Sequence, residues 1–296
     1  MSQIDLAYRV IAIIFPVFSI VAVGYLYARY RGPTDMSSGN RLNMEIFIPA
    51  LIFDALSTSE YALSDYLLLT LGGVVVVLGS GLVAWPVARL LGYQWKTFVP
   101  PMMFNNSGNM GLPLIILTFG NAALPAAILL FAVENTLHFL LGQQMITQRW
   151  SPRTVVQNPM ILATVLGIGV AVSGVVIPEF LRVPIHMLGQ VSIPLLLFSL
   201  GVRMISIDLK DWRIGSVAAI VCPLSGLLMA LLFIQAFPLP AEQASILLLF
   251  SALPPAVLNF LVAERFNQEP QKVASIVLIA NFASVLVIPA VLWVIL

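Results

Sequence analysis

The chain has 296 residues, of which 60% are hydrophobic and only 9% are charged, and its net charge is +1. Soluble domains carry about a quarter charged residues, so this composition predicts an integral membrane protein without a separate soluble domain. One cysteine excludes an internal disulfide, and with only two histidines we expect no metal site, no cofactor and no nucleic-acid partner.

Apolar runs recur along the whole chain, and crossing a bilayer takes roughly 20 apolar residues. The first run continues from Ile11 to Ala28 and is long enough to span, which favours a first helix over a cleaved leader. The second run is short, and the fourth and ninth are interrupted. We therefore predict ten spans, at residues 7–28, 43–58, 65–91, 97–118, 122–147, 159–177, 184–203, 213–237, 242–263 and 272–295.

The positions of lysine and arginine predict the orientation of these spans. All but two of the 14 basic residues fall in the odd-numbered loops or beside them, and the exceptions are Arg9 and Arg182. Cytoplasmic loops carry the excess of Lys and Arg, so we expect the odd loops in the cytoplasm. Both termini would then lie on the outer side of the membrane, which we expect to be the cell's inner or plasma membrane.

Two halves of five spans each must have opposite orientations, because five is odd. A sequence echo supports this division: Ile48-Pro49-Ala50-Leu51-Ile52-Phe53 resembles Ile193-Pro194-Leu195-Leu196-Leu197-Phe198, which begins 145 positions later. We expect a first inverted repeat over 1–148, a cytoplasmic linker over 149–158 and a second repeat over 159–296. Inverted repeats with matching broken helices indicate substrate binding near the midplane.

The fourth span contains the run that we expect to bind substrate. A spanning helix tolerates a break only where the break lines a cavity or is buried in protein. Unwinding near Gly108–Gly111 would expose a helix N-terminus, whose free N–H groups and partial positive charge attract a carboxylate. A simple kink with self-satisfied amides is the plainer alternative. The residues of this run are Asn105, Asn106, Ser107, Gly108, Asn109, Gly111 and Pro113.

The ninth span is interrupted at the corresponding place by Pro254 and Pro255, which should leave backbone carbonyls unpaired. We expect this break to be the symmetric partner of the first and to line the site, with Asn259 as a candidate substrate contact. A proline kink without a binding role is the alternative.

Other polar residues at membrane depth are candidates for support of the crossing or for ion coupling. Glu134 and His138 share a helical face and either carry a proton or hold helices together. Asn135 and Asn281 occupy matching helices and either touch substrate or, as we favour, support the crossing. Asp54 lies near the outer end of the second span. Arg203 ends the seventh span and is interpreted as an orientation anchor rather than an anion gate, which leaves no basic residue in mid-span.

The motif Asn-Ser-Gly-Asn-Met-Gly-Leu-Pro at 106–113, with the Ile-Pro pairs and the Pro-Pro ninth span, resembles the auxin efflux carrier family. The short segment Gln148–Asn158 is similar to that of bacterial members, which include proposed malonate and malate carriers. The resemblance implies ten helices in two inverted repeats, as in bile-acid symporters and sodium/proton antiporters, with helices 4 and 9 broken and crossing. Helices 1, 2, 6 and 7 would form a scaffold that often dimerises, and helices 3–5 and 8–10 an elevator-like transport domain.

The leading hypothesis is therefore a secondary transporter for a small organic anion, such as malonate, malate or an auxin-like acid. A proton or a sodium ion is a candidate coupling ion. The sequence contains no phosphate-binding loop, so we do not expect ATP to drive transport. A sodium/proton or other cation exchanger on the same fold is the alternative. An intramembrane enzyme is disfavoured, because no serine has a clearly placed histidine at membrane depth.

Overall fold

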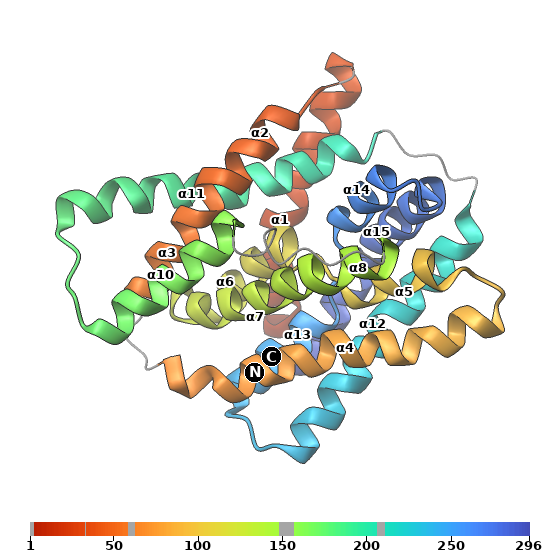
Figure 1. The fold of residues 1–296 in the computed structure, drawn as a ribbon. Helices are drawn as coiled ribbons and strands as arrows, with labels where there is room; N and C mark the ends of the chain where they lie inside the picture. Colours follow the sequence, from red (N-terminus) through yellow and green to blue (C-terminus); the bar gives the residue numbers. More distant parts are fainter. Residues whose placement is uncertain (1–2, 33, 59–62, 148–156, 206–210) are drawn as a thin grey trace.

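A computed structural model describes residues 3–32, 34–58, 63–147, 157–205 and 211–296, and every regular element in these ranges is helical (Figure 1). Of the predicted linker, residues 149–156 lie outside the described ranges. The elements in chain order are α1 (Gln3–Arg31), α2 (Ser37–Leu42), η1 (Asn43–Phe47), α3 (Ile48–Ser57), η2 (Leu63–Tyr66), α4 (Leu67–Leu90), α5 (Trp95–Met103), η3 (Ser107–Gly111), α6 (Leu112–Phe119), η4 (Asn121–Ala123), α7 (Leu124–Leu137), η5 (His138–Gly142), α8 (Gln143–Thr147), α10 (Pro159–Ser173), α11 (Glu179–Arg203), α12 (Trp212–Ala236), α13 (Ala241–Ser251), α14 (Val257–Arg265) and α15 (Pro270–Ile295).

Helices long and apolar enough to cross a membrane confirm the class predicted from composition. Six stretches qualify within the described residues, and shorter apolar helices accompany them. Each of the ten predicted spans coincides with one helix or with a run of helices, although the count of ten crossings stays a prediction. The six long stretches are Gln3–Arg31, Leu67–Leu90, Asn121–Ile146, Glu179–Arg203, Trp212–Ala236 and Pro270–Ile295.

The helices form two groups that meet along the middle of the molecule. In the first group α11 packs against α1 and α3, and α3 also packs against α10. In the second group α12 packs against α4 and α15, and α4 packs against α5. Figure 1 shows the first group at the upper left and most of the second at the lower right. Contacts of α7 with α3 and α10, and of η3 with α11, join the two groups.

Glycines bring helices of the same group into backbone contact. A Cβ atom on Gly201 of α11 would lie 1.9 Å from the Val21 carbonyl oxygen of α1. A Cβ atom on Gly226 of α12 would lie 2.0 Å from the Ser251 carbonyl oxygen at the end of α13. Small residues allow such close approach in membrane helices, where dispersion contacts rather than the hydrophobic effect hold helices together.

Two helices break at the centre of the molecule, and their breaks pair with each other. The chain between α5 and η3 forms an isolated antiparallel bridge, Asn105 to Pro255, with the chain between α13 and α14. The Asn106 N–H donates to the Pro254 oxygen at 2.7 Å, and the Ala256 N–H donates to the Phe104 oxygen at 2.9 Å. Each break therefore satisfies backbone groups that the other has freed, which lipid could not do.

The position of the first break differs from the one predicted. Unwinding was expected near Gly108–Gly111, but residues Ser107–Gly111 form a π-helix that continues into α6. The helix instead breaks at Phe104–Asn106, because only there do the backbone groups find partners in the second break. Hydrogen-bond partners on a distant segment, rather than local glycine content, determine where this helix opens.

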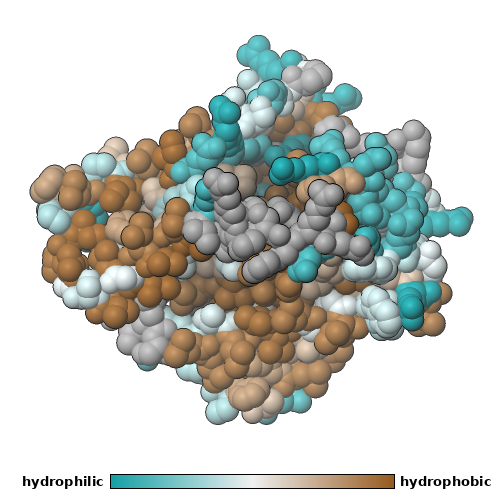
Figure 2. Space-filling model, viewed as in Figure 1, coloured by the Kyte–Doolittle hydropathy of each residue, from teal (hydrophilic) through white to brown (hydrophobic). Residues whose placement is uncertain are grey.

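Apolar side chains cover most of the visible exterior. Figure 2 shows hydrophobic residues over the left and lower parts of this face, and hydrophilic residues gathered at the top and right around α2, α8 and α14. The long helices expose large side chains such as Phe15, Leu82 and Leu286, each more than two-thirds accessible. Such an exterior suits contact with lipid, since isolated soluble domains rarely expose extended apolar patches.

Candidate functional site

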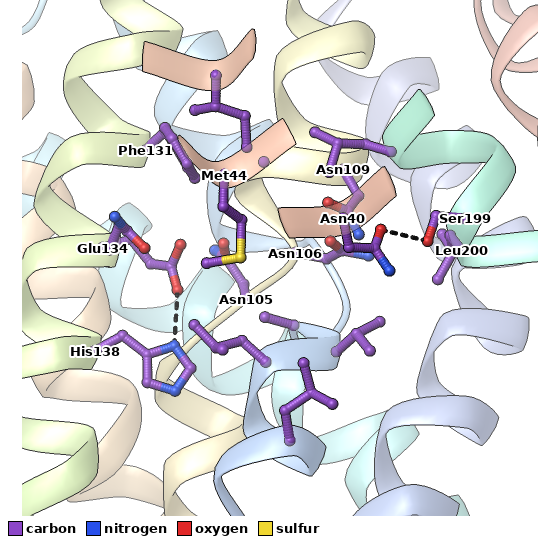
Figure 3. A pocket seen from close by; sticks show the side chains of 18 of the residues that line it. Asn40, Met44, Asn105, Asn106, Asn109, Phe131, Glu134, His138, Ser199 and Leu200 are labelled. Carbon is purple, nitrogen blue, oxygen red and sulfur yellow. Dashed lines mark hydrogen bonds and ion pairs between the residues drawn. The ribbon is translucent and has the colours of Figure 1, made fainter. Parts of the chain in front are cut away.

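The pairing of the two breaks creates a cavity of about 120 Å³ where the two helix groups meet (Figure 3). A water molecule occupies about 30 Å³ in the liquid, so the cavity suits a small solute. Its wall combines residues of the first break, of α7 and of the start of α14 with residues of α2, η1 and α11. The site is therefore shared between elements far apart in the sequence.

Three helices each present one face to this cavity. From α7 and the start of η5 come Phe131, Glu134, Asn135 and His138; from α11 come Leu196, Ser199, Leu200 and Arg203. Both sets follow the i, i+3, i+4, i+7 spacing that places side chains on one side of an α-helix. The third face, at Asn40, Met44 and Ile48, repeats every fourth residue.

The N-termini of η3 and α14 both adjoin the cavity. Gly108 and Asn109 from the first turn of η3 line it, and so do Val257 and Leu258 from the first turn of α14. Along η3, Met110 is the first residue whose N–H group has an acceptor in the same segment, the Asn106 oxygen. Helix N-termini carry unsatisfied N–H groups and a partial positive charge, and both favour an anion.

Most of the amide side chains at the centre are occupied in holding the crossing. Asn105 Nδ2 donates to the Phe250 oxygen at 2.8 Å, and Asn259 Nδ2 donates to the Phe104 oxygen at 2.8 Å. Asn106 Nδ2 donates to Asn281 Oδ1 at 3.1 Å, and Asn281 Nδ2 donates to the Pro255 oxygen at 3.0 Å. Buried amides with partners of this kind stabilise the arrangement, because an unpaired buried polar group is costly.

Asn109 differs from these amides. It lies on the cavity wall, is partly exposed, and has no side-chain hydrogen-bond partner among the described residues. Its donor and acceptor therefore remain available to a bound molecule. Of the residues predicted to bind substrate, Asn105, Asn106, Gly108 and Asn109 line the cavity together.

The other predicted substrate contacts lie behind this wall. Ser107, Gly111, Pro254, Pro255 and Asn259 are buried and are not part of the cavity lining. Pro254 and Pro255 lack the N–H groups that would pair the Phe250 and Ser251 carbonyls in a continuous helix. The freed Phe250 oxygen accepts from Asn105 Nδ2. The Pro254 and Pro255 oxygens themselves accept from Asn106 N–H and from Asn281 Nδ2.

The glycines of the first break have a packing role. A Cβ atom on Gly111 would lie 2.8 Å from Leu253 Cδ1, and one on Gly108 would lie 3.0 Å from the Phe131 ring. Pro113 stands at the start of α6, where η3 leads directly into the helix. Gly111 and Pro113 shape the crossing region without lining the cavity, whereas Gly108 also forms part of its wall.

Glu134 and His138 lie on the same face, as predicted, with Glu134 Oε1 3.8 Å from His138 Nδ1. Both side chains are almost fully buried. The Ser107 hydroxyl donates a hydrogen bond to Glu134 Oε2, and the His138 ring stacks on Phe104 with 4.2 Å between centroids. This places a titratable group beside a candidate anion site and links it to the first turn of η3.

Asn135 lines the cavity next to Glu134, and its Nδ2 lies 3.6 Å from Met160 Sδ, a weak acceptor. Asn281 does not line the cavity but connects Asn106 to the second break. The preference for a supporting role thus matches the hydrogen bonds of Asn281, whereas Asn135 stands where it could touch a bound molecule.

Asp54 is placed away from the crossing. Its Oδ2 lies 2.7 Å from His186 Nδ1 of α11, and both residues line a second cavity of about 530 Å³. That cavity is bounded by the end of α3, the start of α11 and the start of α7. In the predicted orientation this cavity would lie on the outer side.

Two features of the wall were missed by the sequence analysis. Asn40 and Ser199 are joined by a hydrogen bond of 2.6 Å, in which the hydroxyl donates to Asn40 Oδ1. Arg203, interpreted as an orientation anchor, lies on the cavity wall and interacts electrostatically with Glu264 of α14. The i, i+3, i+4, i+7 spacing that ends at Arg203 was the available signal, but only the fold shows that this face lines a cavity.

Comparison with known proteins identifies the class of this protein. A family described as "Membrane transport protein" matches residues 9–157 and 147–294. The chain belongs to this family. The match confirms the resemblance to auxin efflux carriers, and it identifies the protein as a membrane transporter rather than an enzyme.

A curated relative supports the same class. A protein of Rhizobium meliloti (strain 1021) named "Putative malonate transporter" is 25% identical over 314 residues, covering 97% of this chain and 96% of the relative. The similarity extends over essentially the full length of both chains.

Proposed function

We propose that the protein is a secondary transporter for a small organic anion, with one carboxylate bound at the N-termini of η3 and α14. The observation that carries this proposal is the convergence of both N-termini and the unpartnered amide of Asn109 on one cavity. Fixed N–H dipoles attract an anion in a site shielded from water without requiring a deep lysine. The name of the curated relative makes malonate the first substrate to test.

The same arrangement favours an elevator-type movement. The proposed scaffold comprises α1, α2–α3, α10 and α11, and the proposed transport domain comprises α4–α8 and α12–α15. Every hydrogen bond that holds the crossing joins elements of the transport domain, so the domain can move as one body. The Asn40–Ser199 bond and the Gly201 contact with α1 lie within the scaffold.

Two cavities lined by neighbouring residues of α3 support alternating access. Ile48 lines the deep cavity, whereas Leu51 lines the outer one. Three residues of an α-helix rise only about 4.5 Å, so a short displacement could transfer a bound anion from one side to the other. In this proposal the ten spans form two inverted repeats, with both termini outside the cell membrane. A homodimer formed through the scaffold stays a prediction.

Glu134 is the proposed coupling group. An ionised carboxylate beside a bound anion costs Coulomb energy in a medium of low dielectric constant, and protonation removes this repulsion. The other described ionisable side chains in the cavity wall are His138, on the same helical face as Glu134, and Arg203 from α11. Binding of the anion would therefore favour uptake of one proton, which makes a proton the proposed coupling ion and sodium the alternative.

The decisive test is uptake into proteoliposomes. We expect saturable malonate, malate or indole-3-acetate flux, and loss of at least about 90% of it in Asn109→Leu, since the substitution removes the amide and fills the cavity. Gln235→Leu, an amide exchange at an exposed position of α12, is the control. Wild-type flux in a correctly folded Asn109→Leu protein would contradict the proposed site.

A cation exchanger is the second candidate, because Glu134 is the carboxylate that lines the deep cavity. Glu134→Gln separates the two functions. For the anion transporter we expect flux that remains measurable but no longer responds to a proton gradient. Loss of all sodium/proton exchange in that variant, with no organic anion transported by the wild type, would favour the exchanger.

A further inference from the structure

Arg203 lies where two cavities share part of their wall. Outside the deep cavity lies a wider one of about 500 Å³, with Ser37, Arg41 and Glu45 in its wall. Five residues line both cavities and so form a neck between them, with Arg203 as its one basic member within the described chain. The neck residues are Asn40, Met44, Met160, Arg203 and Leu261.

Other polar atoms of the neck suit recognition of an anion. The Ser199 hydroxyl occupies Asn40 Oδ1, which leaves the Nδ2 group at the other end of that amide as a donor. Figure 3 shows Asn40 between Ser199 on one side and the side chains of Asn106 and Asn109 on the other. The deep cavity thus has donors at two ends, from η3 and α14 at one and from α2 and α11 at the other.

The two ends differ in their chemistry. At the inner end the attraction comes from helix N-termini and the Asn109 amide, which suffices for one carboxylate. At the neck it comes from a guanidinium group, which stays charged at any physiological pH and presents a planar fork of N–H donors that matches a carboxylate. An anion with a carboxylate at each end would engage both.

We propose that Arg203 binds the second carboxylate of a dicarboxylate and is the residue that selects doubly charged over singly charged anions. This inference rests on the proposed anion site and adds the specificity of that site. Glu264 interacts with the same arginine from α14, so it competes with the substrate for the positive charge. A guanidinium has donors enough for both, and the inference does not require Arg203 to lack a protein partner.

Equilibrium binding to the purified full-length protein at pH 7.5 tests the proposal with matched pairs of ligands. Succinate is compared with butyrate and malonate with propionate, so that each pair differs by one carboxylate. For Arg203→Gln we expect dicarboxylate affinity to fall about tenfold to 100-fold, the range for loss of a charge-assisted hydrogen bond, with monocarboxylate affinity unchanged. Arg203→Lys should lie between, since it retains the charge but loses the fork.

Two further variants complete the design. Glu264→Gln should tighten succinate binding and leave butyrate binding unchanged, because it removes the competing negative charge without altering Arg203. Arg9→Gln, at an exposed position of α1 on the predicted outer side, should change neither ligand. If Arg203→Gln fails to fold, the lysine variant and Glu264→Gln decide the outcome.

The outcomes are distinguishable from failure of the proposed function. Equal weakening of succinate and butyrate in Arg203→Gln, or no change in either, would overturn the role of Arg203. A wild-type protein that binds butyrate but not succinate would overturn it too, while the anion site would stand. A folded wild type that binds none of the four acids contradicts the anion site and this inference together.

Discussion

The crossing of the two broken helices depends on a buried bond between Asn106 and Asn281, and a double-mutant cycle tests it. Asn281 Oδ1 accepts from Asn106, while its Nδ2 donates to the Pro255 oxygen at 3.0 Å and to the Val277 oxygen at 2.7 Å. Asn281→Ala therefore leaves the Asn106 amide and the Pro255 carbonyl buried without their partner. Asn106→Ala removes one bond and leaves Asn281 Oδ1 without a donor.

The expected losses follow from the number of groups left unpaired. A hydrogen bond inside a membrane protein contributes about 0.6 kcal/mol on average and up to about 1.7, and a stranded buried polar group costs about 1–3 kcal/mol. Asn281→Ala should lower the free energy of unfolding by about 2–4 kcal/mol, and Asn106→Ala by about 1–2 kcal/mol. The double variant should lose about 0.6–1.5 kcal/mol less than the sum, because the shared bond is lost only once.

Reversible unfolding in mixed detergent micelles, followed by tryptophan fluorescence, measures these differences. Gln235→Ala, at an exposed site on α12, should change the free energy of unfolding by no more than about 0.5 kcal/mol and serves as control. Additive losses in the double variant, with a coupling energy of zero within error, would refute the claim that these amides hold the crossing.

Two further predictions concern packing and pH. Gly226→Ala should lower the free energy of unfolding by about 1–3 kcal/mol, because its Cβ would meet the Ser251 carbonyl oxygen at 2.0 Å. The control is Gly169→Ala, where nothing lies within 4 Å, and it should be neutral or stabilising. Equal melting curves for the two variants would contradict the packing. Burial raises the pKa of Glu269, but hydrogen bonds from Lys272 and Thr97 outweigh it and hold that pKa below its ordinary value of 4.5. Glu269 should therefore contribute stability above pH 4.5 that disappears as the pH falls through its folded-state pKa, and Glu269→Gln should flatten that part of an acid titration; an unchanged titration would refute it.

Local composition already located the helices and the neighbourhood of the site. Each hydrophobic run coincides with a helix or a run of helices, since in a bilayer every backbone group must be paired within its own segment unless protein covers it. The same rule pointed to residues 105–113 and 254–255, where amides, glycines and prolines interrupt such runs. The shared face of Glu134 and His138 followed from helical spacing alone.

The roles of individual polar residues depended on the tertiary structure. Asn105, Asn106 and Asn109 look equivalent in the sequence and all line the cavity. The first two side chains pair with Phe250 and Asn281, whereas that of Asn109 has no partner among the described residues. The break opened at Phe104–Asn106, where the other break supplies partners, and not at the glycines. In the sequence Arg203 is only a charge at the end of a span. In the fold it lines one cavity together with residues of α2, α7 and α14. Hydropathy and spacing act along one segment, but hydrogen-bond partners and cavity walls come from segments far apart in the chain, so only their packing decides which side chains are free to bind.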